Sequence, residues 1–167
     1  LRFLNGCQSR FLILDFSDIP GVEVWQVGNE GGFLAHPVNL TADNGSHLLM
    51  GLAERADLIV DFTNVPVGNH VLRNLGPDEP FGGGIPGVDF DPAHEDSTGQ
   101  IMEFRVVPAV AADPTTPPQF LVMPAITPLP AEVRSRPRAL IELESDVHEG
   151  PSEAVLGHVE GGAAVPR

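Results

Sequence analysis

Lysine and tyrosine are absent from this sequence of 167 residues, and cysteine and tryptophan occur once each. The nine basic residues are therefore all arginines, and against 23 acidic residues they leave a net charge of −14. Such an excess of negative charge argues against nucleic acids and anionic membranes as partners. A single cysteine cannot form an internal disulfide, so the sequence leaves the redox compartment and the localisation unknown.

Long apolar runs are also missing, since no segment approaches the ~18 residues of a membrane-spanning helix. The first residues, Leu-Arg-Phe-Leu-Asn-Gly, lie within a predicted strand and show no secretory signal. We therefore expect the chain to be cut from something larger. Its length suits one domain of ordinary size with an appendage.

Proline, glycine and phenylalanine are abundant, at 17, 18 and nine residues. Proline and glycine interrupt helices, and turn signals recur about every ten residues, as in a sandwich of short strands. The composition predicts an all-β fold, a Greek-key β-sandwich over residues 1–107. Its predicted strands are 2–4, 11–16, 22–27, 38–40, 48–50, 58–62, 70–75 and 100–107.

The stretch from 48 to 62 shows the strand pattern most clearly. Leu58, Val60 and Phe62 alternate with other positions and so share one core face. Before them, Glu54 and Arg55 form a charged corner with two interpretations. They are an exposed ion pair worth ~0 to 1 kcal/mol, or Arg55 turns inward and caps loop carbonyls. The residues predicted to be largely buried are Phe11 or Leu12, Trp25, Leu58, Val60, Met102 and Phe104.

The strand pattern lapses between residues 76 and 99, where an acidic run surrounds His94. The run consists of Asp89, Asp91, Glu95 and Asp96. A calcium site is one interpretation, although the spacing is not that of an EF-hand. A solvated, mobile loop at the edge of the sandwich is the default interpretation.

After residue 107 the composition changes to Pro-rich and Ala-rich sequence without a period. We predict an extended, Pro-rich interdomain linker over residues 108–137. Beyond it, residues 138–144 and 155–160 are predicted to form a short strand pair within the segment 138–167.

Four segments resemble cupredoxin domains of multicopper oxidases. Residues 51–62, Gly-Leu-Ala-Glu-Arg-Ala-Asp-Leu-Ile-Val-Asp-Phe, are similar to a Glu-Arg-x-Asp corner that precedes a central strand in these domains. Segments 2–11, 27–34 and 100–106 match in the same order. Together they resemble the second of three cupredoxin domains in the laccase-like branch, which includes spore-coat laccases, bilirubin oxidase and phenoxazinone synthase.

This resemblance implies a structural role in a larger oxidase. In the family the middle domain is free of copper and holds the first and third cupredoxin domains apart, so these domains are the implied partners. The implied parent oxidises phenolic-type substrates and reduces dioxygen to water. Residues 138–167 would then begin the third domain. Two alternatives stay open: a free-standing β-sandwich module for binding or homo-oligomerisation, and a calcium-dependent adhesion-type sandwich.

The ligand count agrees with a copper-free segment. A blue-copper centre needs a thiolate and two imidazoles, but the first histidine after Cys7 is His36. The histidines at 36, 47, 70, 94, 148 and 158 are all at least ten residues apart, so no His-x-His pair exists. We interpret Cys7 as a small, half-buried side chain or an incidental free thiol. No catalytic, cofactor-binding or metal-binding residue is predicted in this segment.

Overall fold

Alternating apolar residues in the first part of the chain build two antiparallel sheets in this computed structural model, which describes residues 1–147 and 150–166. The first sheet has the strand order β1-β6-β3-β4. Its strands are β1 (Arg2–Leu4), β6 (Arg55–Asp61), β3 (Glu23–Asn29) and β4 (Gly32–Asn39). All its pairings are antiparallel, and β3 pairs with both β4 and β6.

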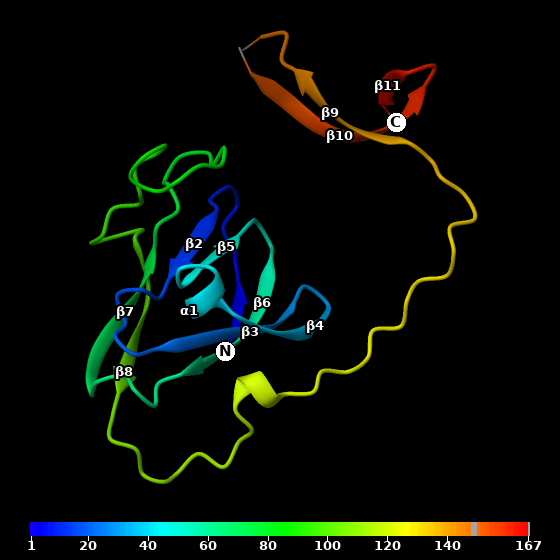
Figure 1. Cartoon of the computed structure of the whole chain (residues 1–167). Helices are drawn as coiled ribbons and strands as arrows, with labels where there is room; N and C mark the ends of the chain where they lie inside the picture. Colours follow the sequence, from blue (N-terminus) through cyan, green and yellow to red (C-terminus); the bar gives the residue numbers. More distant parts are fainter. Residues whose placement is uncertain (148–149, 167) are drawn as a thin grey trace. The chain divides into compact units, whose positions relative to one another are not determined.

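The second sheet has the order β5-β2-β7-β8 and is also antiparallel. Its strands are β5 (His47–Met50), β2 (Leu12–Asp15), β7 (Gly68–Asn74) and β8 (Gln100–Val106). Figure 1 shows both sheets, with a long green loop joining β7 to β8. The predicted all-β class is confirmed, and the sheets are consistent with a cupredoxin-like β-sandwich. The Greek-key arrangement stays a prediction.

One apolar core joins the two sheets. Leu14 and Leu72 of the second sheet are fully buried, as is Val24 of the first. Phe16, just after β2, is the largest fully buried side chain. Leu58 is buried as predicted, while Val60 and Phe104 pack against the core from partly buried positions.

Two of the residues predicted to be buried, Trp25 and Met102, are not part of the core. Trp25 is only half-buried, because Val24 takes the inward position of β3 and the alternation puts Trp25 on the outer face, opposite Ile59. Met102 is 39% exposed. A bulge in β8 inserts one residue, since Leu72 pairs with Met102 but Arg73 pairs with Gln100, and the inserted Ile101 packs on the core.

The predicted strand 38–40 is also corrected. The strand β4 begins at Gly32, and Leu40 already belongs to a one-turn helix, α1 (Leu40–Asp43). The Asn39 side chain accepts a hydrogen bond from the backbone N–H of Ala42 at 3.0 Å, which caps this turn. The cap at Asn39 explains why the strand ends one residue before the predicted end.

The chain divides into two units, Leu1–Ile126 and Thr127–Arg167. After β8, a short 3-10 helix η1 (Pro118–Phe120) belongs to the first unit and buries Pro118. Within the same segment, the backbone N–H and the hydroxyl of Thr115 lower the pKa of the exposed Asp113 carboxyl. The predicted boundaries at 107 and 137 stay predictions.

The second unit contains one three-stranded antiparallel sheet, of order β11-β10-β9. It comprises β9 (Arg138–Glu144), β10 (Pro151–Glu160) and β11 (Ala163–Pro166). The strand β11 was not predicted, although Gly161 and Gly162 before it form a turn with positive φ values of 59° and 86°. The side chain of Ile141 in β9 lies against Gly157 of β10. A Cβ added at Gly157 would lie 2.5 Å from Ile141 Cδ1, so a side chain there would force Ile141 to move.

Candidate functional site

The connection between β1 and β2 is fixed by a buried asparagine. The amide of Asn5 donates to the carbonyls of Arg10 at 2.9 Å and Met50 at 3.1 Å, and its oxygen accepts from the Cys7 N–H at 3.0 Å. Asn5 is completely buried. Because a buried amide must satisfy its hydrogen bonds, the turn that carries Cys7 has a defined conformation.

A second buried asparagine holds the long loop between β7 and β8. The Asn74 side-chain oxygen accepts from the N–H groups of Ile13 at 3.0 Å and Gly76 at 2.9 Å, while its nitrogen donates to the Thr98 carbonyl at 3.2 Å. The two ends of the loop are thereby tied to β2. Gly76 is required there, since an added Cβ would lie 2.6 Å from the Phe11 carbonyl oxygen.

Three aromatic rings pack at the same end of the sandwich. Phe81 lies between Phe11 and Phe90, with ring centroids 5.3 and 5.5 Å apart. Ala93 of the loop is also buried. Beside the exposed residues expected of a solvated loop, it therefore has a small apolar cluster of its own.

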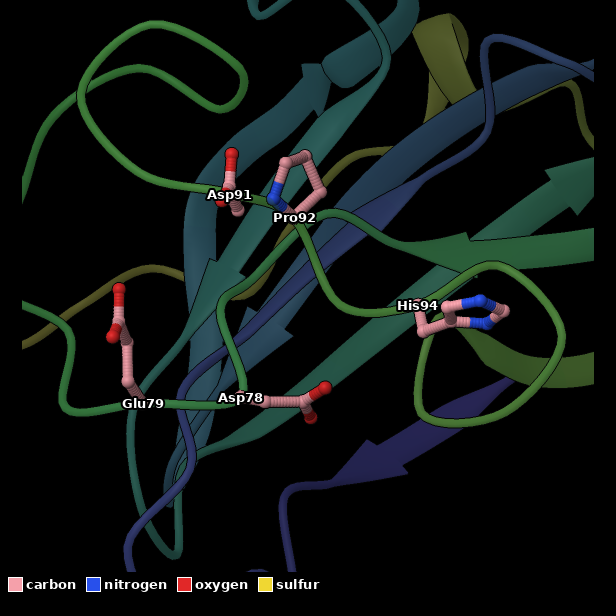
Figure 2. Close-up of a pocket in the computed structure, with 5 residues that line it drawn as sticks. All are labelled: Asp78, Glu79, Asp91, Pro92 and His94. Carbon is pink, nitrogen blue, oxygen red and sulfur yellow. The ribbon is translucent and has the colours of Figure 1, made fainter.

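This loop borders two shallow hollows. The larger, of about 440 Å³, is lined by Asp78, Glu79, Asp91, Pro92 and His94. Figure 2 shows that these side chains come from two stretches of the loop, one at Asp78 and Glu79 and the other from Asp91 to His94.

The smaller hollow lies next to the larger one and shares Asp78 and Glu79 with it. Its volume is about 420 Å³, and its other lining residues are Cys7, Gln8, Ser9, Arg10 and Pro80. Sequence analysis singled out Asp91, His94 and Cys7 but missed Asp78 and Glu79. No local pattern marks this acidic pair, because its neighbours in space come from the distant turn at residues 7–10.

Hydrogen bonds already occupy several polar groups of the hollows. Asp78 binds Arg10 Nη2 at 3.0 Å and accepts from the Thr98 hydroxyl at 2.8 Å. His94 Nδ1 accepts from the Asp96 N–H at 3.2 Å. These contacts hold the loop and the turn together.

The predicted acidic run is dispersed rather than gathered round one point. Asp89 accepts the N–H of Ile85 at 2.7 Å, and Asp91 lines the larger hollow. Across residues 1–147 and 150–166, no three His, Cys, Asp or Glu side chains are close enough to hold a metal ion. The calcium interpretation thus gains no support from the geometry.

The donor set does not fit a blue-copper ion either. Cys7 is half-buried and lines the smaller hollow, where no histidine joins it. Two of the histidines have partners elsewhere: His47 pairs with Asp15 at 3.2 Å, and His70 Nε2 lies 2.8 Å from the Pro66 carbonyl oxygen. His148 lies outside the described residues. That this segment has no copper site stays a prediction.

The charged corner at Glu54 and Arg55 matches neither interpretation fully, because Arg55 caps a carbonyl without turning inward and pairs with a residue other than Glu54. Arg55 donates to the Ala53 carbonyl at 2.7 Å, as a capping arginine should, yet its side chain is 46% exposed. Its ion-pair partner is Glu30 of the β3–β4 turn, at 2.8 Å. Glu54 instead accepts the Gly51 N–H at 2.6 Å. The corner therefore fastens two turns of the first sheet together.

Comparison with known proteins gives two relatives and no matching family model. The chain is 31% identical to bilirubin oxidase of Albifimbria verrucaria over 144 residues, which are 82% of this chain and 22% of that protein. It is 28% identical to multicopper oxidase LPR1 homolog 1 of Oryza sativa subsp. japonica over 121 residues, 72% of this chain and 18% of that protein. The chain thus spans about a fifth of the length of these relatives.

Among the described residues, no helix is long and apolar enough to cross a bilayer.

The two similarities cover about three quarters of the chain, and the first unit of the structure is all-β with two antiparallel sheets. These findings together support a cupredoxin domain of the multicopper oxidase type, as a fragment derived from such an oxidase.

Proposed function

We propose that this chain is the copper-free middle domain of a multicopper oxidase. Its role would be to hold two copper-bearing cupredoxin domains at the separation that electron transfer between their centres requires. The similarity to two multicopper oxidases, in a chain whose one thiol has no histidine beside it, is the observation behind this proposal. The parent would oxidise phenolic-type substrates and reduce dioxygen to water.

The first test is the sequence of the gene on both sides of this segment. A middle domain requires His-x-His pairs upstream and a His-Cys-His block downstream, because these residues supply the imidazoles and thiolate that copper needs. Flanking sequence without either block would contradict the proposal. A block on one side alone would assign the chain to another position in the oxidase.

The second test is copper binding by the chain itself. After loading with copper and dialysis against a chelator, we expect much less than one copper per chain and no thiolate-to-copper charge-transfer band. The reason is that Cys7 and the described histidines are not gathered round one point. Cys7→Ser is the control and should change nothing. Stoichiometric copper with a band lost in that variant would contradict a copper-free role.

A further inference from the structure

The strand β8 forms an open edge of the second sheet. It pairs with β7 on one side only, and at residues 101–106 no other backbone hydrogen bond is found within the described chain. Unpaired N–H and C=O groups along an edge are a template for another strand. Open edges of this kind are usually short, interrupted by proline or covered.

The other edges of the two sheets have such protection. The strand β4 contains Pro37, which has no N–H to donate, while β1 and β5 have only three and four residues. By contrast, β8 has seven residues without proline, and its bulge lies at its beginning, before Met102. Residues 102–106 are therefore a regular edge on which a strand can pair.

The charged side chains on this edge would be complementary to those of a second, antiparallel copy of the same strand. Glu103 and Arg105 lie on the outer face of β8, with side chains 36% and 80% exposed and Arg105 Nε 2.9 Å from Glu103 Oε1. We propose that β8 pairs with β8 of a second copy, antiparallel and centred on Phe104. In this register Glu103 of each copy lies opposite Arg105 of the other, so both ion pairs form between the copies.

The inner face of the same register is apolar. Met102 of one copy lies opposite Val106 of the other, and Phe104 lies opposite its own counterpart. Phe104 and Val106 pack against the core from partly buried positions, and Met102 is 39% exposed at the edge. Pairing would cover these side chains and extend the four-stranded sheet across both copies. The two faces therefore favour one register.

The net charge of −14 per copy opposes this association. Salt of about 0.15 M screens charges beyond ~8 Å but weakens short contacts less. A strand-to-strand interface is also small, so we expect a reversible dimer with a Kd on the order of 10–100 µM. Its population should rise between low and physiological salt.

Sedimentation velocity over a concentration series tests the proposal with three variants of the full chain. Glu103→Arg places two arginines opposite each other, and Arg105→Glu places two glutamates. Each change acts at both symmetric pairs and should raise the dimer Kd by about tenfold or more. The exchange Glu103→Arg with Arg105→Glu restores opposite charges, so its Kd should return to within about threefold of the original.

Hydrogen exchange supplies a readout that does not depend on the variants folding equally well. In the unmodified chain, amide protection at residues 101–106 should increase with protein concentration, while that of the β5 edge should not. A chain that stays monomeric up to ~1 mM would overturn the proposal. A dimer that is equally weak in the single reversals and the double exchange, or equally strong in all, would mean that another surface pairs.

Discussion

At the scale of single residues, two buried asparagines link distant segments of the first unit. Asn5 and Asn74 are 0% and 1% exposed, and each binds backbone groups of several segments. The Asn74 oxygen stands in for a backbone acceptor at the N–H of Ile13 in β2. Each supplies a side-chain partner where the backbone leaves its ladder, so these amides decide where two loops leave the sandwich.

Replacing Asn74 by alanine should destabilise the first unit by about 3 kcal/mol. The change leaves the N–H groups of Ile13 and Gly76 without acceptors, and each unsatisfied buried donor costs about 1 to 3 kcal/mol. Urea unfolding followed by circular dichroism measures the difference. The matched control is Asn69→Ala on the same strand, which is exposed and should lie within about 0.5 kcal/mol of the unmodified chain. Equal losses in both variants would contradict this role.

The alternation of apolar residues predicts a burial only where a strand is regular. Leu58 was predicted correctly because β6 keeps its period on the core side. Asn5 and Asn74 could not be found this way, since their partners lie up to 45 and 61 residues away in the sequence. Asparagine is common in turns and at the ends of strands, so its presence there does not indicate that the side chain is buried.

At the scale of elements, the loop between β7 and β8 depends on the ring of Phe81. Phe81→Ala removes both aromatic contacts, each worth about 0.5 to 1.5 kcal/mol, so the loop should open locally about tenfold more often. Glutamyl endopeptidase, which can cut after Glu95 but poorly after Glu79 because Pro80 follows it, measures this as a faster initial cleavage rate. The sandwich should stay folded, because its core does not include Phe81.

Ile85→Ala is the control for this loop variant. Its side chain is 63% exposed, so its loss should leave the cleavage rate unchanged. If Phe81→Ala and Ile85→Ala were cleaved at the same rate, the three rings would not be what holds the loop. Cleavage spread over the sheets would instead indicate that the whole first unit had been destabilised.

Most strands were predictable from period and turn signals, and the exceptions have physical causes. The bulge in β8 changes which side chain faces the core, and an inserted residue leaves no mark in composition. The end of β4 is set by the cap at Asn39, whose acceptor is a side chain. The hollows beside the loop depend on a contact between Arg10 and Asp78, which are 68 positions apart by number. A local sequence pattern cannot predict a contact between residues so far apart in the chain.

At the scale of the whole molecule, the stretch after the first unit should be the first site of tryptic cleavage. Residues 127–137 contain no helix or strand, and Arg134 there is exposed and followed by serine. Arg136 is followed by proline and should be cut poorly. We expect a first cut after Arg134, which leaves residues 1–134 folded because their core lies within the first unit.

Mass spectrometry of the early fragments and circular dichroism of the larger one measure this outcome. Arg134→Gln is the control and should slow the first cut without changing the fold. A first cut at Arg73 or Arg105, within β7 or β8, would contradict the assignment of the exposed stretch. An unfolded larger fragment would show that the first unit needs residues beyond 134.

The place of Trp25 on the outer face of the first sheet gives the chain an unusual optical property. With no tyrosine and one tryptophan, nearly all its near-ultraviolet absorption and fluorescence comes from a half-buried indole beside Glu23. The emission will report what touches β3 from outside the core, a docking neighbour included. It will be nearly silent about events at β8, which belongs to the other sheet.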